Sequence, residues 1–93
     1  MHIVRKDIIK ENRRGMVVID RKMIYDEPEI MMKIFSKMVV TDIERHTMRD
    51  TLTYYAFSPL FDPVNETQAC PEYDIHVFVS DSGDICIEVV KQQ

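Results

Sequence analysis

The sequence predicts an α+β domain in which one main helix, at about residues 27–45, packs on a mostly antiparallel sheet of about three to five strands as a two-layer sandwich. A one-sided apolar stripe at helical spacing predicts the helix, whereas residues 51–58 and 73–90 have the apolar spacing of strands. A chain of 93 residues with 45% apolar side chains can form one hydrophobic core but not two. We therefore treat residues 1–93 as a single domain.

The first quarter of the chain has the weakest pattern. Apolar side chains in residues 1–14 recur every four to five positions, which favours a short helix, and a flexible arm over the same range is the alternative. Gly15 then interrupts the pattern. We expect residues 16–19 and 23–25 to form a β-hairpin around the polar segment 20–22, and a single strand in which residues 20–22 face solvent is the alternative.

The helical signal is clearest after residue 25. Asp26 is a good N-cap, Glu29 lies three positions further on as in a capping box, and Pro28 falls in the first turn, where its missing N–H costs little. The apolar stripe that follows consists of Ile30, Met31, Ile34, Phe35, Met38, Val39 and Ile43. We expect this stripe to be the helix face that packs on the sheet.

The second half of the chain predicts strands. Residues 51–58 alternate and are rich in aromatic and β-branched side chains, so they form a strand that ends before Pro59. Pro59 and Pro63 cannot take part in a continued ladder, and residues 58–71 therefore form a long loop of the kind that often carries function. Residues 73–90 form a hairpin.

The register of this hairpin follows from its apolar pattern. A two-residue loop would place Val77 opposite Glu88 and mix polar and apolar side chains on both faces, whereas a three-residue loop, Asp81–Gly83, makes one face wholly apolar. We therefore expect the longer loop, with Gly83 in a left-handed conformation. The expected pairs are Val79–Ile85, Val77–Ile87, Ile75–Val89, His76–Glu88 and Phe78–Cys86.

Composition mainly excludes functions. The 2 glycines argue against a glycine-rich phosphate loop, and the 2 cysteines, without Cys or His neighbours at ligand spacing, predict neither a zinc site nor a disulfide framework. No apolar run approaches the roughly 18 residues of a membrane helix. The first residues also lack the apolar stretch of a signal peptide, so we expect a cytoplasmic protein.

Charge is distributed unevenly along the chain. Residues 1–50 hold 11 Lys and Arg against 9 Asp and Glu, whereas residues 51–93 hold a single basic residue, Lys91, against 7 acids. An acidic half without arginine is a poor surface for phosphates but suits a basic protein partner. The alternative is that these acids only keep a β-rich half soluble and protect its edges.

No pattern predicts catalysis. A Cys86–His76 pair would lie diagonally across two strands with no nearby cation to activate the thiol. The carboxylates of residues 81–84 lack the spacing of a calcium-binding EF-hand loop, and helix capping explains those of residues 26–29. We therefore expect no enzyme activity, no cofactor and no metal site.

Large apolar side chains crowd residues 54–61. Alternation sends Tyr54 to one sheet face and Tyr55 with Phe57 to the other, and a two-layer core buries only one face. The outer face must then be covered by the N-terminal segment, by a second copy of the chain or by another protein. The predicted partner-binding residues are Tyr55, Phe57, Leu60, Phe61, Asp62, Glu66 and Glu72.

These patterns favour a non-enzymatic protein-binding module, an inhibitor or regulator, that binds a basic protein and forms a homodimer. A Met- and Ile-rich, glycine-poor chain of this size also resembles small phage accessory proteins. The alternative is a nucleic-acid-associated regulator, which the acids interleaved in its basic cluster disfavour. A small enzyme with its site at a dimer interface is the third hypothesis. The basic cluster of the alternative consists of Lys6, Lys10, Arg13 and Arg14.

Overall fold

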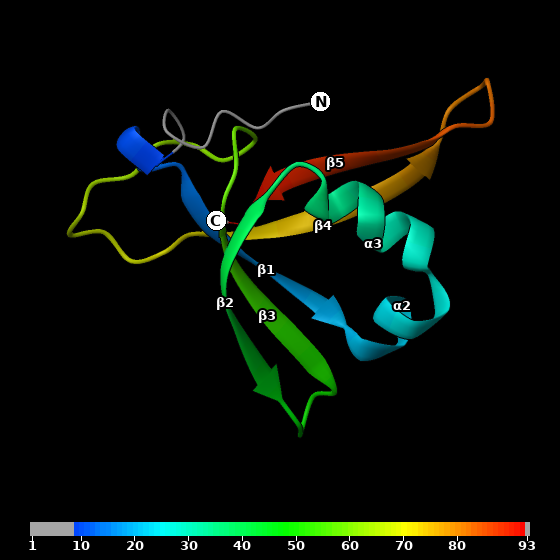
Figure 1. Ribbon diagram of the computed structural model, residues 1–93, viewed down its shortest axis with the longest axis horizontal. Coiled ribbons are helices and arrows are strands. Elements are labelled where there is room, and N and C mark those ends of the chain that lie inside the picture. The colour runs from blue at the N-terminus through cyan, green and yellow to red at the C-terminus, as the bar shows by residue number, and fades with distance from the viewer. Residues whose placement is uncertain (1–8, 93) are drawn as a thin grey trace.

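A computed structural model describes residues 9–92. The central strand of its sheet comes from the N-terminal half of the chain. The strands are β1 (Arg14–Asp20), β2 (Val39–His46), β3 (Thr51–Phe57), β4 (Glu72–Val79) and β5 (Ile85–Lys91). They form one sheet in the order β2-β3-β1-β4-β5 (Figure 1). Every second residue of β1 is buried, as expected for a central strand with helices on one side only.

The fold is α+β, as the sequence predicts, and the five-stranded sheet has three antiparallel pairings and one parallel pairing. β1 pairs with β3 in antiparallel fashion over its whole length, whereas its pairing with β4 is parallel and limited to Met16–Glu72 and Val17–Tyr73. The β4–β5 hairpin then diverges from β1 (Figure 1). Both neighbours of β1 come from much later in the chain, so local patterns could not reveal the parallel pair.

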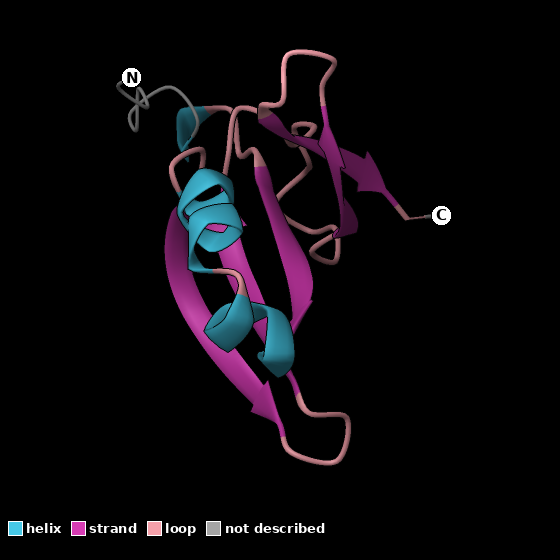
Figure 2. Cartoon of the chain, turned by 90° about the vertical axis from the view of Figure 1, so that its right-hand side faces the viewer, coloured by secondary structure: helices cyan, strands magenta, loops and turns pink. Residues whose placement is uncertain are grey.

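Two short helices replace the single main helix that the sequence predicts. They are α2 (Arg21–Asp26) and α3 (Pro28–Phe35), and both lie on the same face of the sheet (Figure 2). The expected helix at 27–45 was therefore wrong beyond Phe35, because residues 39–46 form β2. The β-branched run at Val39 favours a strand, and its apolar side chains had matched the helical spacing by coincidence.

The capping prediction also fails in its details. Asp26 ends α2 and does not cap α3, whose N-cap position is Glu27 without a side-chain cap hydrogen bond. Pro28 does fall at the start of α3. The predicted hairpin over residues 16–25 was wrong, because residues 23–25 are helical and Met23 packs against the core.

The second half of the chain folds as predicted. β3 ends at Phe57, a loop follows to residue 71, and the β4–β5 register contains all five expected residue pairs. Gly83 has φ 88°, and its N–H donates to the carbonyl of Ser80 at 2.9 Å. The three-residue loop and its left-handed glycine are thus confirmed.

The core lies between the helices and the sheet and includes one residue from the long loop. The buried cluster consists of Val17, Ile19, Met31, Ile34, Met38, Tyr54, Ala56, Phe61 and Tyr73. Phe61 is 0% exposed, and its ring stacks on Tyr73 with centroids 4.4 Å apart. A Cβ atom at Gly15 would lie 2.7 Å from the Tyr73 ring, so glycine lets this stacked pair pack directly on the β1 backbone.

The predicted helix or arm at residues 1–14 lies largely outside the described residues. Within that range, Ile9 and Lys10 are helical, and Asn12 adopts φ 55° before β1 begins. Among the described residues, no helix is both long enough and apolar enough to cross a membrane.

Candidate functional site

The sheet face opposite the helices, here called the outer face, contains a hollow of about 240 Å³. The strand register explains it: Tyr55 lies beside Met16 on one row and Thr53 beside Val18 on the next. The short side chains of Val18 and Thr53 are thus flanked by longer ones. The lining residues are Met16, Val18, Glu44, His46, Arg49, Thr51, Thr53, Tyr55 and Glu72.

Polar contacts hold one carboxylate in position at the rim of this hollow. The Tyr55 hydroxyl donates to Glu44 Oε2 at 3.4 Å, and His46 Nε2 lies 3.4 Å from Glu44 Oε1. The Glu44 carboxylate raises the pKa of the Tyr55 phenol, which is the donor in this contact. The Glu44 side chain remains 55% exposed, so its charge is accessible to a ligand.

The same cluster is poorly arranged for nucleophilic catalysis. His46 Nε2 lies 3.1 Å from Thr53 Oγ1 and also contacts Glu44. In a catalytic triad the carboxylate orients one ring nitrogen while the other accepts the hydroxyl proton, whereas here a single nitrogen makes both contacts. Thr53 is also only 3% exposed, which keeps its hydroxyl away from a substrate.

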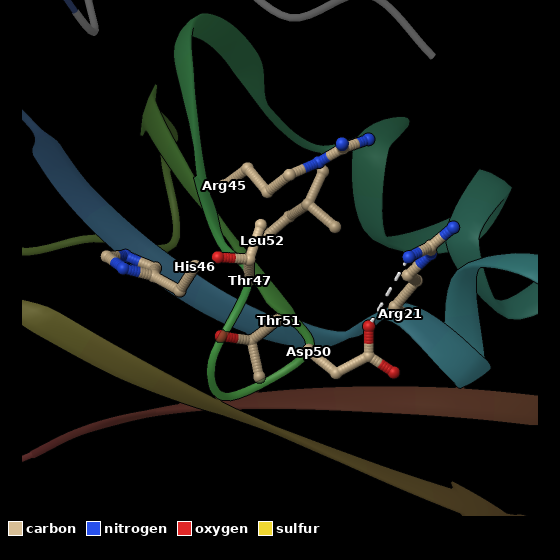
Figure 3. Close-up of a pocket in the computed structure, with 7 residues that line it drawn as sticks. All are labelled: Arg21, Arg45, His46, Thr47, Asp50, Thr51 and Leu52. Carbon is tan, nitrogen blue, oxygen red and sulfur yellow. Dashed lines mark ion pairs between the residues drawn. The ribbon is translucent and has the colours of Figure 1, made fainter.

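A second, smaller hollow of about 50 Å³ lies at the tip of the β2–β3 hairpin (Figure 3). Arg21 approaches Asp50 across it, with Nη1 and Oδ1 3.6 Å apart. The Arg21 N–H also donates to the Asp50 carbonyl at 3.0 Å, so these contacts fasten the hairpin tip to the start of α2. Because the hollow is small and its contacts connect two segments of the chain, we assign it a structural role.

Two of the predicted basic residues fasten the long loop to the start of β1. Arg13 Nη1 donates to the Phe61 carbonyl at 3.0 Å, and Arg14 Nη2 donates to the carbonyls of Asn65 and Gln68. Of the remaining cluster, Lys10 is exposed. Lys6 lies outside the described residues.

Replacing Arg14 with alanine is expected to loosen this loop without unfolding the domain. The guanidinium group satisfies several loop carbonyls, and charged hydrogen bonds of this kind contribute about 1.5–3 kcal/mol when well formed, less at a partly exposed site. We expect amide hydrogen exchange at Gln68 to accelerate about tenfold, since each 1.4 kcal/mol is a factor of ten. The Arg49→Ala variant is the control, and an equal acceleration in it would contradict the assignment.

The predicted partner-binding residues do not form one surface. Tyr55 and Glu72 both line the outer-face hollow. Phe57 is half-buried and lies beside Arg14 on the outer face, outside that hollow. Phe61 is in the core and is not available to a partner in this structure.

The other three predicted residues lie along the loop. Leu60 is 43% exposed, and Asp62 is exposed with Oδ2 3.9 Å from Lys91 Nζ. Glu66 is also exposed, and its carbonyl accepts a hydrogen bond from Arg14. These residues are separate from the hollow.

Sequence reasoning missed Glu44, His46 and Thr53. The available signal was the alternation of Asp42, Glu44 and His46, which share one face once residues 39–46 are assigned to a strand. The helical assignment of these residues concealed that face.

Cys70 is not placed for reactivity. Cys70 is half-buried, and burial raises the pKa of its thiol although Arg14 partly opposes the effect. Within residues 9–92, no group of three or more His, Cys, Asp and Glu side chains is arranged to hold a metal ion.

The fold and the site together define a class: a small α+β domain with helices on one face of a mixed five-stranded sheet and a polar-rimmed hollow on the other. No family model, curated protein sequence or solved structure matches this chain.

Proposed function

We propose that this protein is a non-enzymatic binding module that docks a basic segment of another protein on the outer face of its sheet. The observation that carries the proposal is the outer-face hollow, which places apolar Met16 and Val18 next to the carboxylates of Glu44 and Glu72. An arginine or lysine side chain has the matching character, because it combines an apolar stem with a cationic end.

Charge on the outer face supports a basic partner. Register places six acids on this face: Asp20, Asp42, Glu44, Glu72, Asp74 and Glu88. Of its arginines, Arg14 already donates to loop carbonyls, which leaves Arg49 at the hollow. Carboxylates therefore outnumber available cations, which favours and steers a positively charged segment.

The geometry of Tyr55 supports an arginine in particular. Its hydroxyl is directed to Glu44, and the aromatic ring lies within the lining of the hollow. A guanidinium can stack on an aromatic face while it donates two hydrogen bonds to one carboxylate. The ammonium group of a lysine would be attracted to the carboxylate, but it is not planar and could not stack on the ring in this way.

The test is a titration of the isotope-labelled protein with a peptide of alternating arginine and glycine, followed by NMR. We expect shift changes concentrated at the amides of Val18, Glu44, Tyr55 and Glu72, with at least tenfold weaker binding for the Glu44→Gln/Glu72→Gln variant. A peptide with citrulline in place of arginine has the same shape without the charge and should not bind.

The matched control is Glu27→Gln/Glu29→Gln, which removes the same charge from the helical side of the domain. Equal weakening in both variants would mean that the peptide responds only to net charge and would exclude a docking site on the outer face.

A further inference from the structure

The two edge strands of the sheet are protected to different degrees. β2 has a register shift between Val40 and Asp42, carries the charged residues Asp42, Glu44 and Arg45, and is exposed over most of its length. Bulges and charges of this kind prevent an edge strand from pairing with another chain. β2 is therefore a protected edge.

β5 has no register shift within its seven residues and carries fewer charges than β2. Its register with β4 is continuous, and the strand carries one acid, Glu88, with a single basic residue, Lys91, at its end. The remaining residues are Ile85, Cys86, Ile87, Val89 and Val90. A regular and largely apolar edge with one charge of each sign is a type that can pair with a further strand.

The β4–β5 hydrogen bonds show which backbone groups of β5 point away from β4. Gln92 N–H donates to the Glu72 carbonyl, and at the other end Ser80 N–H donates to the Asp84 carbonyl. The even-numbered residues of β5 therefore bond to β4, and the odd-numbered residues direct their N–H and C=O groups to the edge. Ile85 is one of these, and its carbonyl accepts a hydrogen bond from Lys33 Nζ at 2.6 Å.

We propose that β5 pairs antiparallel with β5 of a second copy of this chain, with Val89 opposite its own counterpart. In this register Ile87 faces the second copy's Lys91, and each such pair exchanges two backbone hydrogen bonds. The pairs between residues 87 and 91 do not include Ile85, whose carbonyl already accepts a hydrogen bond from Lys33.

The side chains of β5 favour a copy of itself over a foreign strand. Centring on Val89 places Glu88 opposite Val90 of the second copy, so the only acid of the strand does not meet itself. Val90 is 37% exposed in the single chain and would be covered. A strand with so little charge has no pattern to select a basic or an acidic partner, whereas its apolar face complements an identical face.

This dimer does not depend on the function proposed above. Antiparallel pairing of identical edges places the two-fold axis perpendicular to the sheet, so both outer faces lie on the same side of the joined sheet. The dimer would thus present two hollows in one direction to a repetitive or bivalent partner.

The test compares Val90→Glu with Val90→Lys by sedimentation of the full chain over a range of concentrations. Each substitution adds one charge opposite Glu88 of the second copy. The two-fold axis of the dimer makes this contact occur twice. We expect the wild type and Val90→Lys to dimerise and Val90→Glu to dissociate at least tenfold more readily. Circular dichroism melts establish that both variants fold, which matters because Val90 also lies beside Asp74 in the same chain.

Oxidative cross-linking tests the register in a Cys70→Ser background. The cysteine of Gln92→Cys would lie opposite Cys86 of the second copy, at a Cα separation that a disulfide can span. Within one chain, positions 86 and 92 are roughly 20 Å apart, because a strand rises about 3.3 Å per residue. A linked dimer is expected for Gln92→Cys and not for Glu88→Cys. A wild type that is monomeric throughout, equal behaviour of the two Val90 variants, or cross-linking of Glu88→Cys alone would each overturn the proposal.

Discussion

Replacing Phe61 with alanine is expected to lower the free energy of unfolding by about 3–5 kcal/mol, the usual cost of removing a buried aromatic side chain. Phe61 is 0% exposed and stacks on Tyr73, whose hydroxyl accepts a hydrogen bond from the N–H of Asp62 at 2.9 Å. The substitution would therefore leave a cavity in the core and release the loop from the sheet. Urea denaturation measures the change. An unaltered slope of the unfolding free energy against urea concentration would show that the variant and the wild type unfold in the same transition.

The adjacent Leu60 provides the control, because it is 43% exposed and belongs to the same loop. Leu60→Ala should cost less than about 1 kcal/mol, in the range of surface substitutions. If Phe61→Ala retained full stability and instead lost binding to a partner, Phe61 would be the exposed anchor that the sequence suggests and not a core residue.

The sequence predicts the second half of this fold better than the first for a physical reason. The β4–β5 hairpin depends on contacts between neighbouring segments, and its register is decided by apolar alternation and by Gly83, all of which are visible locally. β1 pairs instead with β3 and β4, so its partners lie far away in sequence. Local patterns therefore suggested a hairpin with residues 23–25, which are helical.

The missed part of the site follows from one ambiguous stretch. Residues 36–46 contain apolar side chains at positions that match the helical stripe, yet the structure divides them between a turn and β2. Helical and strand spacings coincide over short apolar runs, so only tertiary pairing decides between them. Alternation within β3 was sufficient to predict that Tyr55 lies on the outer face. The position of Glu44 on that face could be predicted only with the pairing of β2 and β3.

Phe61 in the long loop is buried in the structure, although the sequence predicts that it is exposed. The prolines of this loop exclude it from the sheet, as predicted, but Arg13 and Arg14 bind its carbonyls and Phe61 enters the core beside Gly15. Aromatic residues in a proline-rich loop look exposed when only local pattern is considered. Burial here depends on a space that a glycine in another segment provides.

Gly15→Ala is expected to destabilise the domain by about 1–3 kcal/mol, the usual cost of overpacking a core. The added methyl group would lie 2.7 Å from the Tyr73 ring and 2.9 Å from the Phe61 ring, both closer than van der Waals contact permits. The opposite effect, a stabilisation of about 0.4–1 kcal/mol from a less flexible unfolded chain, is expected only where the methyl group has space. Thermal and urea unfolding of the variant determine the sign.

A double-mutant cycle identifies the cause of the loss. Phe61→Leu removes the ring edge that the methyl group would meet, so Gly15→Ala should cost markedly less in the Phe61→Leu background than in the wild type. Additive losses would instead place the strain at Tyr73 alone, because the Tyr73 ring remains in both backgrounds. A stabilised Gly15→Ala variant would mean that the stacked pair does not lie on β1 in solution.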